Sequence, residues 1–144
     1  MSDTHETLAA KQMITEVLYR YCHTVDRNDG PGIRSVWHPD GLADYEGFST
    51  GTADEFVDRV LTSHSYASAL SHQLTNILID VDVASDRATS VSYVTALVRV
   101  PGTDHVARTQ YHDSWSRRDG VWAIDTRRVL LPIVQVIPND VEPS

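Results

Sequence analysis

Two residues far apart in the chain have side chains suited to proton transfer. Asp26 lies one helical turn beyond Cys22, at the edge of an apolar stripe, and His72 opens a strand-like segment at residues 71–76. A carboxylate that accepts the Nδ1 hydrogen of an imidazole fixes its tautomer and leaves Nε2 as a base. Taken alone, each residue has an ordinary interpretation, a solvated turn aspartate and a structural strand histidine. The catalytic pair is therefore a hypothesis, which requires the two side chains to meet.

Further polar side chains are candidates for binding a substrate beside this pair. Tyrosine hydroxyls can polarise a carbonyl or hold a leaving group, although tyrosine also packs well within strands. Arg128, late in the last strand-like segment, is either an internal partner for Asp26 or a surface cation. His112 follows Tyr111 directly, so only one of these two can face inward. The candidate substrate-binding residues are Tyr21, Tyr45, Tyr93, His112 and Arg128.

Motifs for other chemistries are missing from the sequence. There is no Gly-x-Ser-x-Gly nucleophile elbow, phosphate loop, His-Glu-x-x-His or Gly-x-Gly-x-x-Gly fingerprint. The seven histidines have no tight metal-ligand spacing, and the single cysteine, Cys22, fits a small buried side chain better than a nucleophile. We therefore predict a site that uses no metal and no organic cofactor.

Composition limits the class of protein. A chain of 144 residues with 41% hydrophobic content fits one domain with a sizeable core. The formal net charge of −8 disfavours nucleic acid as a partner, and no run of about 18 apolar residues is present to span a membrane. The polar N-terminus lacks the features of a secretion signal, so the expected location is cytoplasmic.

The hydrophobic pattern changes from helical to strand-like along the chain. It predicts a helix over residues 6–26, a short helix over 31–37, a short strand over 42–46, and a third helix that starts at Thr52 or Asp54 and runs to about residue 63. Four long strands are expected over residues 69–83, 87–100, 105–117 and 121–136, with an Asp119-Gly120 hairpin turn before the last. Strand alternation predicts that His72, Leu74, Asn76 and Leu78 share one face.

Helices followed by an antiparallel meander indicate an α+β fold. We expect a single domain over residues 1–144, in which a curved sheet wraps around the first helix and leaves a pocket at its open end. Residues 132–144 contain three prolines and are expected to form a C-terminal tail. The apolar residues Ile77, Ile79, Val94, Ala96 and Val98 exceed what one core needs, which favours a homo-oligomer.

The chain resembles the SnoaL-like branch of the NTF2-like superfamily over about residues 8–130. The resemblance rests on Ile14 to Asp26, on the turn at residues 37–41, on residues 71–76, and on residues 111–115 and 117–124. It implies an NTF2-like (cystatin-like) cone of curved antiparallel sheet with three N-terminal helices. It also implies a dimer or a trimer.

Within that superfamily, the placement of Asp26 and His72 looks most like scytalone dehydratase and hexachlorocyclohexane dehydrochlorinase. In those enzymes a histidine takes a proton from the substrate and an aspartate orients it, without a cofactor. The resemblance therefore implies a cofactor-independent lyase that acts on a small hydrophobic or cyclic molecule. The dehydrochlorinase has a lysine where this chain has Tyr21, so the contact with the leaving group differs. The alternatives are an isomerase or polyketide-cyclase-like enzyme, and a non-catalytic ligand-binding or oligomerisation module.

Overall fold

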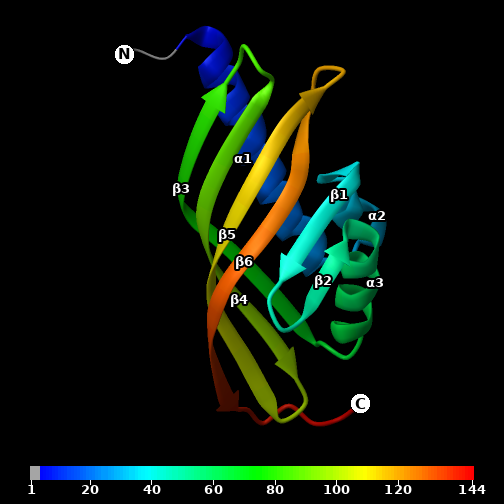
Figure 1. Ribbon diagram of the computed structural model, residues 1–144. Helices are drawn as coiled ribbons and strands as arrows, with labels where there is room; N and C mark the ends of the chain where they lie inside the picture. Colours follow the sequence, from blue (N-terminus) through cyan, green and yellow to red (C-terminus); the bar gives the residue numbers. More distant parts are fainter. Residues whose placement is uncertain (1–3) are drawn as a thin grey trace.

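The computed structural model describes residues 4–144, except for the side chains of Leu131 and Pro132. Three helices and six strands follow one another along the chain (Figure 1). They are α1 (His5–Asp26), α2 (Gly30–Arg34), β1 (Trp37–Tyr45), β2 (Ser49–Thr52), α3 (Ala53–Ser63), β3 (Ala69–Asp82), β4 (Arg87–Val100), β5 (Thr103–Arg118) and β6 (Val121–Pro138).

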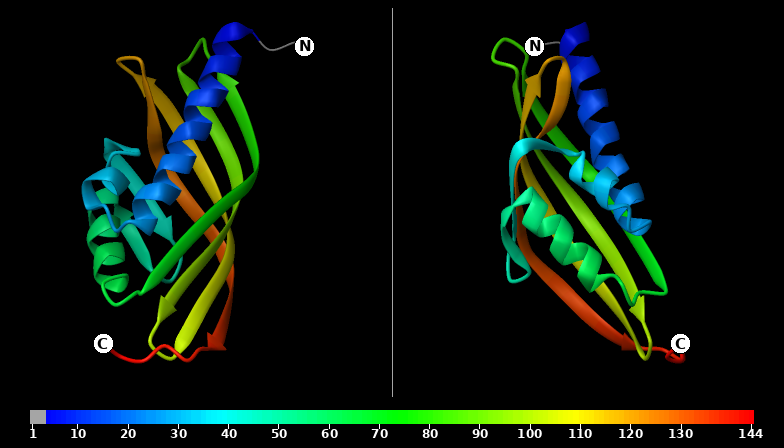
Figure 2. Two further views of the ribbon diagram at one scale, coloured as in Figure 1. Left: turned by 180° about the vertical axis from the view of Figure 1, so that it is seen from behind. Right: turned by 90° about the vertical axis from the view of Figure 1, so that its right-hand side faces the viewer.

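The strands form one curved sheet, in the order β2-β1-β6-β5-β4-β3. Neighbouring strands are antiparallel except for β1 and β6, which pair in parallel. Seen from behind, α1 runs diagonally along one face of the long strands, and α3 lies beside β1 and β2 (Figure 2). The predicted α+β class and the curved sheet with N-terminal helices are confirmed, with one parallel strand pair within it.

Helix α1 forms because its apolar residues recur every three or four positions. The resulting stripe is buried against the sheet and consists of Ala10, Ile14, Val17, Leu18, Tyr21, Cys22 and Val25. The hydroxyl of Thr4 accepts a hydrogen bond from the Thr7 amide and caps the first turn. The helix ends where Asn28 adopts a φ of 53°, and this ending leaves Asp26 in the last turn.

A bulge in β3 reverses which residues face the core. The pairing with β4 shifts between Thr75 and Leu78, where Asn76 adopts a φ of 52°. Beyond that point Ile77 and Ile79 pack against the core, whereas Leu78 is 76% exposed. The prediction that Leu78 shares a face with His72 is therefore wrong, because the extra residue shifts the alternation by one.

Strand β6 continues into the segment that we expected to be a tail. Residues 133–138 pair with residues 103–108 of β5, so only residues 139–144 lie outside regular structure. The register shifts between Arg108 and Gln110, opposite the step from Leu130 to Ile133. Pro132 falls within this irregularity, where a residue without an amide hydrogen does not interrupt the ladder.

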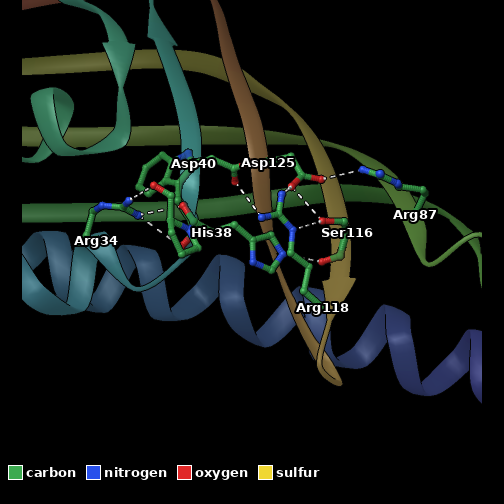
Figure 3. Close-up of polar contacts among 9 residues, drawn as sticks. Arg34, His38, Asp40, Arg87, Ser116, Arg118 and Asp125 are labelled. Carbon is green, nitrogen blue, oxygen red and sulfur yellow. Dashed lines mark hydrogen bonds and ion pairs between the residues drawn. The ribbon is translucent and has the colours of Figure 1, made fainter.

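Helix α2 ends earlier than the predicted helix over 31–37, and β1 begins earlier than the predicted strand over 42–46. Arg34 explains the compact corner between them, because its guanidinium donates to the carbonyls of residues 37–39 at 3.3, 3.2 and 2.8 Å. Across the sheet, Arg118 reaches Asp40 at 2.9 Å and Asp125 at 2.8 Å (Figure 3). These contacts fix the start of β1 to the β5–β6 hairpin.

Candidate functional site

Asp26 and His72 meet in the structure, 46 residues apart in sequence. The Nδ1 atom of His72 lies 2.7 Å from Oδ1 of Asp26, and the backbone amide of His72 donates to Oδ2 at 3.1 Å. The His72 side chain is 7% exposed and the Asp26 side chain 26% exposed. Both carboxylate oxygens therefore hold the same residue, which fixes the imidazole in one orientation.

The other side of the His72 ring faces a cavity of about 210 Å³ between the sheet, α1 and α3. The cavity walls are mainly aromatic and aliphatic, with a few hydroxyl and imidazole groups. The lining residues are Tyr21, Tyr45, Glu46, Phe48, Phe56, Val60, His64, His72, Ala96, Val98, Ala107, Thr109, Tyr111 and Val129. An apolar hollow with few polar groups is typical of a small-molecule site.

A fully buried ion pair lies beside the tyrosines of this cavity. Arg127 donates to both oxygens of Asp113 at 2.7 and 2.9 Å, and both side chains are 0% exposed. The same guanidinium donates to the hydroxyl of Tyr45 at 3.1 Å, and Tyr45 donates to the hydroxyl of Tyr21 at 2.8 Å. Its plane lies 4.0 Å from the ring centre of Tyr111. A fixed positive charge therefore polarises a chain of hydroxyl groups at the cavity wall.

Burial determines the charge states of these groups. It raises the pKa of Tyr21 and of Tyr111 well above the ordinary value, and it raises the pKa of Tyr45 against the opposing effect of Arg127. Burial opposes the charge on Arg127, but the Asp113 carboxylate outweighs this and holds the guanidinium pKa well above its usual range. At neutral pH the hydroxyls are thus uncharged donors beside a permanent cation.

Tyr21 and Tyr45 line the cavity together with His72, as the sequence hypothesis requires. Three other candidates do not. Tyr93, His112 and Arg128 occupy alternate strand positions to the buried residues around them, and they lie on the opposite face of the sheet. Grouping these three residues with His72 in one pocket was therefore wrong.

That opposite face carries a larger groove of about 750 Å³, whose walls include Tyr93, Arg108 and Arg128. It lies away from the Asp26–His72 pair, so its size does not make it the better candidate for proton transfer. Of the five residues expected to form an oligomer interface, only Val94 also lines this groove. Ile77 and Ile79 pack against the core, Val94 is buried, and Ala96 and Val98 line the cavity. The oligomer itself stays a prediction.

Sequence reasoning missed Arg127, Asp113 and His64. Arg127, not its neighbour Arg128, faces inward, because β6 has an extra residue between Ile124 and Thr126 that changes the alternation. Asp113 is opposite Arg127 in the ladder only because of this extra residue, since the register set by the hairpin turn at residues 119–120 alone would place Thr126 opposite Asp113. His64 caps the end of α3, and no sequence pattern marks it as a cavity residue.

Among residues 4–144, no helix is long and apolar enough to cross a membrane. Over the same residues, no group of three or more His, Cys, Asp or Glu side chains is arranged to hold a metal ion.

Solved structures of similar shape are numerous. A putative scytalone dehydratase from Novosphingobium aromaticivorans has a TM-score of 0.77 and 22% identity, over 95% of this chain and 92% of that one. The hexachlorocyclohexane dehydrochlorinase LinA-type3 from Novosphingobium barchaimii has a TM-score of 0.74 and 20% identity, over 92% of this chain and 91% of that one. A protein of unknown function from Mycobacterium tuberculosis has a TM-score of 0.74 and 23% identity, over 90% of this chain and 75% of that one. At these identities the likeness establishes the fold alone.

No match was found among curated proteins. The model of the SnoaL-like domain family, in contrast, matches residues 6–128, which include both members of the Asp26–His72 pair and the buried Arg127. This match covers most of the chain, and the protein therefore belongs to the SnoaL-like domain family.

Proposed function

We propose that this protein is a lyase that eliminates water or halide from a small, largely apolar, cyclic molecule, with His72 as the base and Asp26 as its orienting partner. The observation that carries the proposal is the 2.7 Å contact between His72 Nδ1 and Asp26 Oδ1 at the wall of a largely apolar cavity. Two of the similar structures are described as a dehydratase and a dehydrochlorinase, which agrees with this reaction class.

The geometry assigns a direction to the proton transfer. Asp26 accepts the Nδ1 hydrogen, so the lone pair of His72 lies on Nε2. A substrate C–H bond then gives its proton to Nε2, while the carboxylate stabilises the imidazolium that forms. As the carbon–oxygen or carbon–halogen bond breaks, the hydroxyl of Tyr21, which accepts the Tyr45 hydrogen and keeps its own, is a donor for the negative charge that develops.

The cavity volume limits the substrate. An engineered cavity of about 150 Å³ in another protein accepts benzene, so about 210 Å³ suits one substituted ring. The same base and the Tyr21 hydroxyl would also serve an isomerase, which needs a donor for an enolate oxygen. A pure binding module would have no need for a hydrogen-bonded acid–base pair beside an open interior.

A model substrate can test the base without knowledge of the natural one. In 3-hydroxycyclohexanone, loss of a C2 proton and of the C3 hydroxyl gives cyclohexenone and water, which ¹H NMR in D₂O detects. We expect turnover to fall about 10²–10⁴-fold in His72→Gln and in Asp26→Asn, and to persist in His112→Leu on the opposite face. Full turnover in His72→Gln, or no acceleration by the wild-type protein of either elimination or C2 exchange, would contradict the proposal. Deuterium uptake at C2 without loss of hydroxyl would identify an isomerase.

A further inference from the structure

His64 is a second histidine at the cavity, at the end of the helix α3. It follows α3 directly, and its backbone amide donates to the carbonyl of Val60 at 2.9 Å, so the end of the helix fixes its position. Its ring centre lies 6.3 Å from that of His72, with an angle of 47° between the ring planes. Both rings line the same cavity.

The two nitrogens of the His64 ring have different surroundings. Nδ1 is enclosed by protein and has no hydrogen-bond partner among the described residues. A buried N–H without an acceptor is rarer, and more costly, than an unused lone pair. The hydrogen of the neutral ring therefore belongs on Nε2, and the edge of the ring that can meet a ligand is a donor.

The His64 ring also stays neutral while His72 takes up and releases a proton during turnover. Burial, followed by the proximity of His72, lowers the pKa of His64 from 6.5 to about 4. When His72 takes up a proton during turnover, the new positive charge further disfavours protonation of His64. The donor is thus a neutral imidazole, which polarises an oxygen without competing for the proton that His72 carries.

We propose that His64 is a substrate-binding residue that donates a hydrogen bond from Nε2 to an acceptor oxygen of the substrate, and so selects oxygen-bearing rings. Two hydrogen bonds of about 2.9 Å that meet at one atom fit between rings 6.3 Å apart, so a single oxygen can lie within reach of both histidines. This inference rests on the proposed lyase function.

In that reaction the oxygen is the leaving hydroxyl. The C–H bond breaks and its proton goes to Nε2 of His72; the C–O bond breaks as the carbon–carbon double bond forms. The proton then passes from His72 to the departing oxygen and completes a water molecule. His64 keeps its own hydrogen throughout and holds the oxygen beside His72.

A matched pair of ligands tests the hydrogen bond without any turnover. Cyclohexanone and methylenecyclohexane have the same shape, but only the ketone accepts a hydrogen bond. We expect the ratio of their affinities, measured by ¹H NMR titration, to shift about three- to tenfold against the ketone in His64→Leu. His64→Gln, which keeps an N–H donor, should retain most of the preference, and His112→Leu should leave it unchanged.

The tautomer of the wild-type ring gives an independent readout. Long-range ¹H–¹⁵N NMR spectra should place the hydrogen on Nε2 of His64, and the ring should stay neutral down to about pH 5. An unchanged affinity ratio in His64→Leu, no detectable binding of cyclohexanone to the wild-type protein, or a hydrogen on Nδ1 would each overturn the inference. If instead the ketone preference depends on His64 while elimination and exchange are absent, the lyase proposal fails and the binding role of His64 stands.

Discussion

Substitutions in the buried pair of Arg127 and Asp113 should lower the stability of the protein more than substitutions at its other polar contacts. Asp113→Asn keeps the shape of the side chain but leaves the Arg127 charge buried, with only the Tyr45 hydroxyl and aromatic rings around it. Two charge-assisted hydrogen bonds, of 2.7 and 2.9 Å, are weakened at once. Uncompensated buried charge costs about 3–5 kcal/mol. A domain of this size is stable by about 5–15 kcal/mol, so the loss is large.

Urea unfolding followed by tryptophan fluorescence measures this loss, because Trp37, Trp115 and Trp122 are all buried. The double variant Asp113→Leu/Arg127→Met removes both charges. We expect it to be less destabilised, by about 1–3 kcal/mol, than the sum of the single variants Asp113→Leu and Arg127→Met.

The surface pair of Arg87 and Asp125, with Arg87 67% exposed, is the control for this experiment. Its removal by Arg87→Ala should cost less than about 1 kcal/mol. A loss below about 1 kcal/mol in Asp113→Asn at an unchanged m-value, or a double variant as unstable as the sum of the singles, would refute the reasoning.

Three further predictions concern the elements that position the site. Thr52→Ala removes the capping box of α3 that Thr52 forms with Glu55, so the free energy of unfolding in urea should fall by about 1 kcal/mol, whereas Thr52→Ser should match the wild type. Asn76→Ala places a non-glycine residue without a side-chain amide at a φ of 52°, and should lower the free energy of unfolding in urea by about 1 kcal/mol. Asn76→Gly should not lower it. The pKa of His64 is lowered to about 4 in the native protein. Between about pH 6.5 and pH 4 the unfolded chain therefore binds a proton at this histidine, whereas the native ring stays neutral. Native stability is thus lost as the pH falls from 6.5 to 4, and His64→Leu should recover about 1–2 kcal/mol across that window, a figure reduced for the partial exposure of the ring. A difference in the free energy of unfolding between the wild type and His64→Leu that stays constant from pH 6.5 to pH 4 would contradict this prediction.

Local patterns predicted the long elements well. The apolar stripe of α1 and the β-branched runs of β3, β4, β5 and β6 are long and regular, and each of their boundaries was predicted to within two residues. The Asp119-Gly120 turn adopts φ values of 52° and 79°, as a tight hairpin between twisted strands requires. Short β2 has too few residues to show a period.

The side chains that face the core were predicted less well than the helices and strands themselves, because one extra residue in a strand moves every following side chain to the other face of the sheet. Asn76 moved Leu78 to the surface, and the irregularity before Thr126 put Arg127 rather than Arg128 in the interior. Both bulges depend on pairing with a neighbouring strand, which a single strand's sequence does not contain. Asp26 and His72 escaped this difficulty, since Asp26 ends a helix and His72 precedes the first bulge in β3.

The two buried charge systems differ in their access to water, and the difference fits the proposed chemistry. Arg127 and Asp113 are sealed at 0% exposure, so their charges are permanent and act on the cavity only through the field and the Tyr45 hydroxyl. Asp26 is 26% exposed and borders an outer groove of about 490 Å³ that also reaches His72. His72, which takes the proton, lines both this groove and the inner cavity, so it has a route to solvent, whereas a group that only stabilises developing charge acts best where water is excluded. A site for binding alone would need neither the titratable pair at the edge nor the fixed charge behind the hydroxyls.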